Sequence, residues 1–585
     1  MIGSLVSQLC FQSGIFPIEL EEAFQQVHNT VGHQKPTLQL LRQILENFVQ
    51  RSHVVILIDA LDECLQRQEA VDFISGLQRT KSSPSILITS RDDVEMQAGL
   101  YMFTHMRIEG HLAEVNQDVE SYIKHRLSSE RRLQWLNDSV KDDIASLLIE
   151  KSAGMFRWVQ CQIDAIAILR TVKAIRAALK ELPKGLDETY DNILTKIPDS
   201  DTETVRRILM WVSFAVMPLT LSAVHEAIAI DPYMDHLDEE STLRTPQDML
   251  DLCGSLVIAS EEGYLGLAHL SVKEYLLSQR TKQNKAVSAY ALEPDSANHE
   301  LAENCLAYLS FHELSSGPCP SADDYTSRLI RLPLVNYAAV SWSYFVRATT
   351  VTPKLQDRIT RFFHTPPSPT FMSWVQVLNA IHGSWDFYPH TTTTLYYAST
   401  FGLADTVEDL LRNPDIKALL DAPGSRFGGT ALHGAVLREH LSVMQLLLDA
   451  GADANKADLN KISPLHTAAE YGNPDVITML LEAGANLHAL DHEGQTPYDW
   501  AVRAANSVAI SMLSRAAELL TEVNPGPPFP STPPSSRPSS FPGSAELPSY
   551  PTDPRNEAIL LMSRRGTLRL DSRISFLNRS KSADS

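Results

Sequence analysis

Cysteine is scarce in this chain of 585 residues. Its six cysteines are scattered, without the close pairs that bind zinc or the density that stabilises small secreted domains. A disulfide framework and a structural zinc site are therefore not expected. Sparse, unpaired cysteine is typical of a reducing compartment, so we predict a cytoplasmic protein.

Long apolar runs are also lacking. The first twenty residues have no cationic stretch followed by an apolar one, so no signal peptide is expected. The closest approach to a membrane span is the uncharged stretch of residues 208–225, but Pro218 and several polar residues interrupt its second half. Two helices with a turn at Met217-Pro218 are favoured over a membrane span, and no membrane association is predicted.

Basic residues are outnumbered, with 50 lysines and arginines against 71 acidic residues and a net charge of −21. Such a field repels phosphate backbones, so nucleic acid is not an expected partner.

At about 150 residues per domain, a chain of 585 residues is predicted to form roughly four domains. A hydrophobic fraction of 44% supplies material for several buried cores.

A short pattern recurs every 33 residues near the C-terminus. Thr-Ala-Leu-His-Gly-Ala, Ser-Pro-Leu-His-Thr-Ala and Thr-Pro-Tyr-Asp-Trp-Ala begin at Thr430, Ser463 and Thr496. The first two are followed by an apolar helix and then Ala-Gly-Ala. The pattern resembles the ankyrin repeat, and a degenerate copy at Thr394 is offset by 36 residues. We expect about four repeats over residues 391–520, forming a surface that binds a protein partner.

Two histidines occupy the same place in this pattern. The resemblance to ankyrin repeats implies that His433 and His466 hydrogen-bond to backbone between neighbouring repeats, and this is favoured over metal binding or catalysis. The third copy has Asp499 at that place and Tyr498 instead of leucine. These departures favour a terminal capping repeat.

An acidic cluster follows an apolar strand near the N-terminus. Residues 54–58 are uninterruptedly apolar, which predicts a strand in a parallel sheet covered on both faces. A second apolar strand, residues 85–89, is followed by Ser90 and Arg91. The two strands resemble the Walker B and sensor strands of P-loop NTPases. That resemblance implies that Asp59 binds Mg²⁺, that Asp62 or Glu63 orients water, and that Arg91 contacts the terminal phosphate of a nucleotide.

The wider pattern resembles fungal NACHT domains, which belong with the NOD-like receptors to the signal-transducing NTPases called STAND. The segments that carry the resemblance, in chain order, are residues 4–10, 32–38, 57–64, 87–92, 153–159, 182–190, 217–221, 267–276 and 334–338. The resemblance implies a multidomain protein, α/β at its N-terminus and α-helical afterwards.

The expected domains follow in order along the chain. A thirty-residue stretch with eleven prolines, residues 525–554, cannot form a packed core and predicts a disordered tail. The predicted domains are a partial NACHT nucleotide-binding domain at 1–135, a helical domain at 136–200, a winged-helix domain at 201–285, a helical spacer at 286–390, the ankyrin repeats at 391–520, and a Pro/Ser-rich and basic disordered tail at 521–585.

The phosphate-binding loop of such NTPases is not found in this sequence. A P-loop requires Gly-x-x-x-x-Gly-Lys-Ser/Thr, and no Gly-Lys dipeptide occurs. In the family this loop precedes the segment matched by residues 4–10, so we interpret the chain as N-terminally truncated. ATP or ADP with Mg²⁺ is expected to bind only if the loop is supplied, and enzymatic activity is not expected of the chain as given.

His269 is a further candidate, at the start of a predicted helix in the winged-helix domain. The family resemblance implies a contact with the diphosphate of ADP. The alternative is a histidine that caps or packs within the winged helix, and both interpretations stay open.

Two functional hypotheses follow. The first is a signalling protein of the NACHT-ankyrin type, as in fungal non-self recognition, whose repeats bind a protein partner and whose NACHT domain forms a homo-oligomer. The alternative is a non-enzymatic ankyrin adaptor or dominant-negative fragment without nucleotide-dependent activity.

Overall fold

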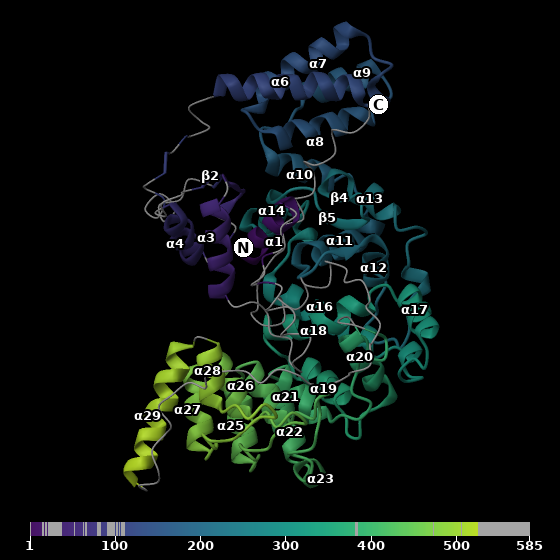
Figure 1. Ribbon diagram of the computed structural model, residues 1–585. Coiled ribbons are helices and arrows are strands. Elements are labelled where there is room, and N and C mark those ends of the chain that lie inside the picture. Colours follow the sequence, from purple (N-terminus) through teal and green to yellow (C-terminus); the bar gives the residue numbers. More distant parts are fainter. Residues whose placement is uncertain are drawn as a thin grey trace. The chain divides into compact units, whose positions relative to one another are not determined.

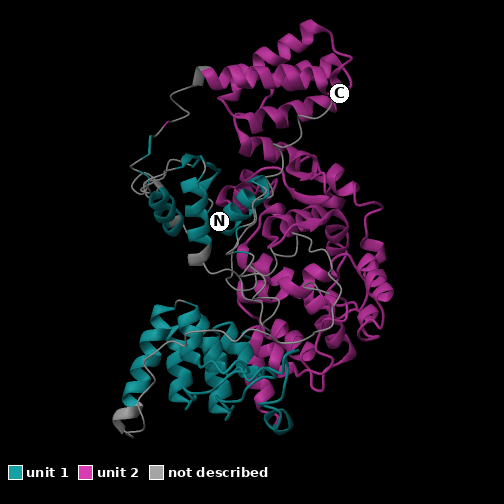
Figure 2. Ribbon diagram, viewed as in Figure 1, with its two compact units in different colours: residues 1–105, 402–404, 414–548 teal, residues 106–401, 405–413, 549–585 magenta. Residues whose placement is uncertain are grey.

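The architecture is described from a computed structural model, in which helices predominate (Figure 1). The chain divides into two compact units, residues 1–105, 402–404 and 414–548, and residues 106–401, 405–413 and 549–585 (Figure 2). The structure describes residues 2–13, 17, 20, 38–51, 53–61, 64, 67–78, 84–90, 100, 103–104, 106, 112–380, 384–471, 473–504 and 506–523.

The N-terminal segment is an α/β arrangement, as the sequence predicts. Strands β1 (Val55–Ile58) and β2 (Ser85–Ile88) pair in parallel, with Val55 opposite Ser85 and Ile58 opposite Ile88. Parallel pairing requires a crossover connection, and this one contains a helix. The helices here are α1 (Ile2–Ser13), α3 (Leu38–Arg51) and α4 (Arg67–Gln78).

The prediction that this sheet is covered on both faces is wrong for the strands that the structure describes. Val54 and Ile56 are buried in a cluster with residues of α1 and α3. Side chains alternate along a strand, so the intervening residues point to the other face. On that face Leu57 is 65% exposed, and Val55 and Leu87 are exposed as well. The uninterrupted apolar run therefore has one buried and one exposed face.

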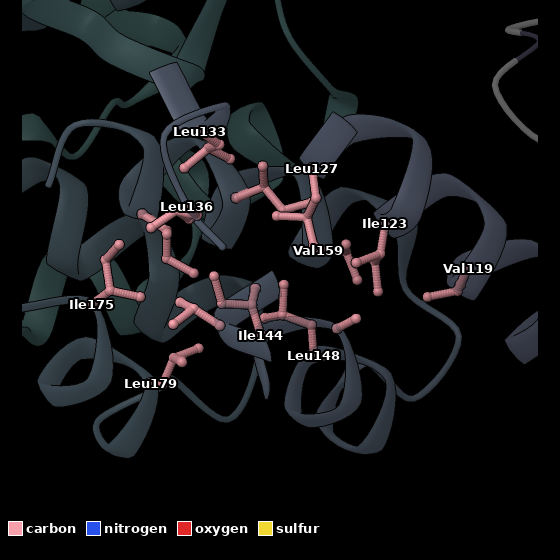
Figure 3. Packing of buried hydrophobic residues seen from close by; sticks show 14 of the residues in the cluster. Val119, Ile123, Leu127, Leu133, Leu136, Ile144, Leu148, Val159, Ile175 and Leu179 are labelled. Carbon is pink, nitrogen blue, oxygen red and sulfur yellow. The ribbon is translucent and has the colours of Figure 1, made fainter. Parts of the chain in front are cut away.

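A helical bundle follows, around a single apolar core that runs from Val119 to Leu179 (Figure 3). Residues 119, 123 and 127 recur at helical spacing, which places them on one face of the first helix. Because that helix begins at Leu112, the bundle includes residues 112–135, which were predicted to belong to the nucleotide-binding domain. Its helices are α6 (Leu112–Ser129), α7 (Asp138–Ser152), α8 (Phe156–Ala167) and α9 (Val172–Lys180).

The next segment combines helices with a small antiparallel sheet, as a winged helix does, and the strand order of the sheet is β3-β5-β4. The expected turn at Met217-Pro218 is confirmed, because one helix ends at Phe214 and the next begins at Leu221. The elements are α10 (Leu186–Leu194), α11 (Thr202–Phe214), β3 (Leu219–Thr220), α12 (Leu221–Ala227), α13 (Asp248–Cys253), β4 (Val257–Ala259), β5 (Tyr264–Leu267), α14 (Leu270–Leu277) and α15 (Gln279–Gln283).

The helical spacer packs around aromatic side chains, among them Trp342, Phe371 and Trp374, all fully buried. An ion pair between Arg206 of α11 and Glu300 joins it to the winged helix, in which Arg206 Nη2 donates to both carboxylate oxygens of Glu300, at 2.9 and 3.0 Å. Its helices are α16 (Pro294–Leu309), α17 (Ala322–Arg331), α18 (Val335–Arg347), α19 (Pro353–Phe362) and α20 (Pro369–Ala380). Among the described helices, none is both long and apolar enough to cross a membrane.

Four helix pairs follow at the predicted repeat positions. An additional short helix, α23 (Pro414–Lys417), comes after the first pair and accounts for its longer spacing. The pairs are α21 (Thr394–Thr400) with α22 (Ala404–Leu411), α24 (Ala431–Leu437) with α25 (Leu441–Asp449), α26 (Pro464–Tyr471) with α27 (Pro474–Glu482), and α28 (Pro497–Arg503) with α29 (Ser507–Val523). The disordered tail was predicted to begin at residue 521, but α29 continues to Val523, and residues 524–585 of the predicted tail lie outside the described residues.

The described residues also form short 3-10 helices. They are η3 (Arg131–Leu133), η4 (Asp199–Asp201), η5 (Glu239–Ser241), η6 (Gly254–Leu256), η7 (Ser288–Tyr290) and η8 (His312–Leu314).

Candidate functional site

The carboxyl end of β1 carries Asp59, which β2 holds in place. The hydroxyl of Thr89 donates to Asp59 Oδ1 at 2.5 Å and accepts from the Ala60 backbone N–H at 2.8 Å. The backbone of Thr89 also bonds to Ile58 and Leu61 at 2.9 Å. One threonine therefore orients the carboxylate and fastens the turn that carries it.

The other predicted nucleotide-site residues cannot be placed beside it. Asp62, Glu63 and Arg91 lie outside the described residues. Within the part of the chain that the structure describes, no group of three or more histidine, cysteine or acidic residues could hold a metal ion. A single exposed carboxylate does not fit Mg²⁺-nucleotide by itself. The roles of Asp59, Asp62, Glu63 and Arg91 therefore stay predictions.

His269 is the N-cap of α14. Its Nδ1 accepts from the Ser271 backbone N–H at 3.1 Å and lies 2.7 Å from the Ser271 hydroxyl. The structure thus shows a histidine that caps a helix of the winged-helix domain, which is one of the two interpretations left open by the sequence. Contact with ADP stays a prediction.

The same cap leads to the neighbouring helix α10. The Ser271 hydroxyl lies 2.8 Å from the hydroxyl of Tyr190. Next to it, Asp191 accepts from the Tyr275 hydroxyl at 2.6 Å and from Arg280 at 2.5 Å. Sequence reasoning missed these pairs because their members are more than eighty residues apart and no local pattern marks them.

The repeat histidines bridge consecutive repeats, as predicted. His433 Nδ1 accepts from the Thr430 backbone N–H at 3.1 Å, and its Nε2 lies 3.0 Å from the carbonyl of Ile462. Because Nδ1 accepts, the proton resides on Nε2, which donates to the carbonyl. Burial lowers the pKa of His433 and so favours this neutral form.

His466 repeats this geometry one repeat further on. Its Nδ1 accepts from the Ser463 backbone N–H at 3.2 Å, and its Nε2 lies 3.1 Å from the Gln495 carbonyl. Burial lowers the pKa of His466 as well. Both histidines therefore have structural roles, with both ring nitrogens engaged by protein atoms.

The last described repeat uses different residues. Asp499 Oδ2 accepts from the Thr496 backbone N–H at 2.8 Å and from its hydroxyl at 2.7 Å. A carboxylate caps the helix but has no second nitrogen to donate onward, which suits a terminal repeat. Trp500 donates to the buried Asp491 at 2.8 Å, and its ring lies 5.5 Å from that of His466.

Comparison with known families finds three matches along the chain. Residues 1–91 match the N-terminal domain of nephrocystin 3. Residues 194–289 match the winged-helix domain of GPI inositol-deacylase. Residues 395–491 and 432–522 match ankyrin repeats.

Two similar proteins come from fungi. The chain is 31% identical over 296 residues to azaphilone pigments biosynthesis cluster protein L of Monascus ruber, covering 47% of this chain and 61% of that protein. It is 26% identical over 237 residues to vegetative incompatibility protein HET-E-1 of Podospora anserina, covering 40% of this chain and 17% of that protein. The chain therefore spans less than two thirds of either relative.

The fold and these matches define a class, a multidomain protein that joins a nephrocystin-type N-terminal domain and a winged helix to ankyrin repeats. Each match covers only a part of this chain, and the two fungal proteins are what the chain is similar to.

Replacement of His466 by alanine should lower the free energy of unfolding of the repeats by about 2 kcal/mol, because it leaves the Ser463 N–H and the Gln495 carbonyl unpaired. Urea unfolding followed by circular dichroism measures this. The exposed His492, replaced by alanine, is the control. An equal effect of both substitutions would contradict the bridging role.

The same bridges make stability depend on pH. A histidine whose pKa is lowered on folding binds protons more weakly in the folded state than in the unfolded state. As pH falls below the ordinary histidine pKa of 6.5, proton binding therefore stabilises the unfolded state relative to the folded state. The wild-type repeats should therefore lose stability between about pH 6.5 and pH 5, and the His466→Ala variant should lose less over that range.

The cap at His269 predicts a graded response to substitution. His269→Ala should destabilise the winged helix by about 1 kcal/mol, whereas His269→Asn, which retains an N-cap acceptor, should recover most of the loss. Thermal unfolding of the two variants and the wild type tests this. If asparagine is as destabilising as alanine, the cap is not what His269 contributes.

Proposed function

We propose that this chain is a regulatory protein whose ankyrin array binds a protein partner, in signalling of the kind that fungal non-self recognition uses. The observation that carries the proposal is the array itself, in which buried histidines join successive repeats through backbone hydrogen bonds. Such joined repeats present a continuous surface for another protein. The fungal relative named for vegetative incompatibility supports the same role.

A selection for partners tests the array directly. In a two-hybrid selection against an expressed-gene library of a related fungus, the whole chain should return a small set of partners. A chain carrying both His433→Ala and His466→Ala, which unlinks the repeats, should lose them, while Leu419→Ala, at an exposed position outside the loops between the repeats, should retain them. Partners that bind all three chains equally would contradict the proposed role of the array.

We further propose that the N-terminal segment is a degenerate switch that does not turn over nucleotide in this chain. One observation supports this. The sequence has no Gly-Lys dipeptide, which a P-loop carries directly before its serine or threonine. Positioning and charge stabilisation by the P-loop and its lysine carry much of phosphoryl transfer, and one aspartate cannot replace them.

Titration calorimetry with Mg²⁺-ATP distinguishes a nucleotide-dependent signalling protein from an ankyrin adaptor without nucleotide-dependent activity. We expect no binding tighter than about 100 μM, and no difference between the wild type and Asp59→Ala. Micromolar binding that Asp59→Ala abolishes would contradict the proposal and would identify a working nucleotide site.

A further inference from the structure

Three exposed loops precede the first helices of successive repeats, and we name residues 421–430, 454–463 and 487–496 the recognition loops. Each is closed by a side chain at the same place in the repeat. Ser425 Oγ accepts from the Gly429 N–H at 2.7 Å, Asp458 Oδ1 from the Ile462 N–H at 2.9 Å, and Asp491 Oδ1 from the Gln495 N–H at 2.8 Å. Their conformation is therefore fixed by their own hydrogen bonds.

Neighbouring recognition loops are also bonded to one another. The Leu459 backbone N–H donates to the Phe427 carbonyl at 2.9 Å, and the His492 N–H donates to the Asn460 carbonyl at 3.0 Å. The tips of the three loops therefore form one continuous edge rather than three independent segments.

Apolar side chains are exposed on this edge. Leu459 is 79% exposed and Leu490 is 56% exposed. In the neighbouring repeats, the positions equivalent to Leu459 are occupied by Arg426 and His492. The repeat fold therefore does not require leucine there. The Leu459 side chain lies against Gly428 of the preceding loop, and the rest of its surface is available for contact with a partner.

The recognition loops are closer to charge balance than the rest of the array, with four acidic residues against three lysines and arginines. Among the acidic residues, Glu493 is exposed, with a carboxylate oxygen 3.9 Å from His492 Nε2. Asp458 and Asp491 are engaged by backbone N–H groups, as is Asp421, which accepts from the Asp453 N–H at 3.0 Å. Lys456 and Lys461 are exposed and form no ion pair with the residues that the structure describes. Elsewhere in residues 391–523 there are thirteen acidic residues against five lysines and arginines.

We propose that the recognition loops bind an acidic peptide segment that carries an aliphatic or aromatic side chain. Leu459 and Leu490 supply the apolar contact, and Lys456 and Lys461 pair with the carboxylates of the ligand. The acidic helices around them repel a peptide that docks anywhere else, and so favour this edge. This inference rests on the proposed partner binding and names the chemistry of the partner.

Selection of random twelve-residue peptides displayed on phage, with the whole chain as bait, provides the test. The enriched peptides should combine aspartate or glutamate with leucine, isoleucine, phenylalanine or tryptophan. The most enriched peptide, synthesised with a fluorescent label, should bind with an affinity that Leu459→Ala lowers about tenfold and that the double variant Lys456→Glu, Lys461→Glu lowers further.

Matched controls use the same chemistry elsewhere on the array. Leu419→Ala removes another exposed leucine, and the double variant Asp449→Lys, Glu482→Lys reverses two exposed charges on the second helices of the repeats. Both should change the affinity less than twofold. Circular dichroism of every variant should match the wild type, because all six positions are exposed.

Other outcomes overturn the inference in distinguishable ways. Enriched basic peptides whose binding the Asp449→Lys, Glu482→Lys variant removes would place the docking surface on the acidic helices and leave partner binding intact. Self-association of the wild type in sedimentation velocity, lost in Leu459→Ala, would assign the edge to a second copy of the chain. Failure to enrich any peptide contradicts the inference, whereas the two-hybrid selection decides separately on partner binding.

Discussion

The hydrogen bonds of two buried histidines are the constraint on which the repeat array depends. Each imidazole accepts from the first turn of its own repeat and donates to a carbonyl 29 residues further on. Because both nitrogens are used inside a buried site, protonation would remove an acceptor and place a charge among apolar groups. The neutral imidazole therefore sets the spacing between repeats, and with it the register of the loops that the repeats present.

A different constraint governs the N-terminal segment. Thr89 holds the Asp59 carboxylate and the turn beyond β1 through one hydroxyl and two backbone bonds. Yet the sheet exposes Leu57 and Leu87 on one face, which a parallel sheet normally covers with helices.

The sequence predicted those features that recur or are local. The 33-residue period placed His433, His466 and Asp499 at equivalent positions, and the structure confirms the role of the two histidines. Contacts between distant residues were not predictable, since Thr89 and Asp59 are 30 residues apart and Tyr190 and Ser271 are 81 apart. An unbroken apolar run also hides which side chains are buried, so the exposure of Leu57 could not be read from it.

The ring nitrogens of His433 and His466 give the most direct test of this account. In the chain labelled with ¹⁵N-histidine, nuclear magnetic resonance should show both rings as neutral Nε2–H tautomers whose pKa lies below the ordinary histidine value. Titration of the two repeat histidines with an ordinary pKa, or a proton on Nδ1, would show that the bridges between repeats do not exist.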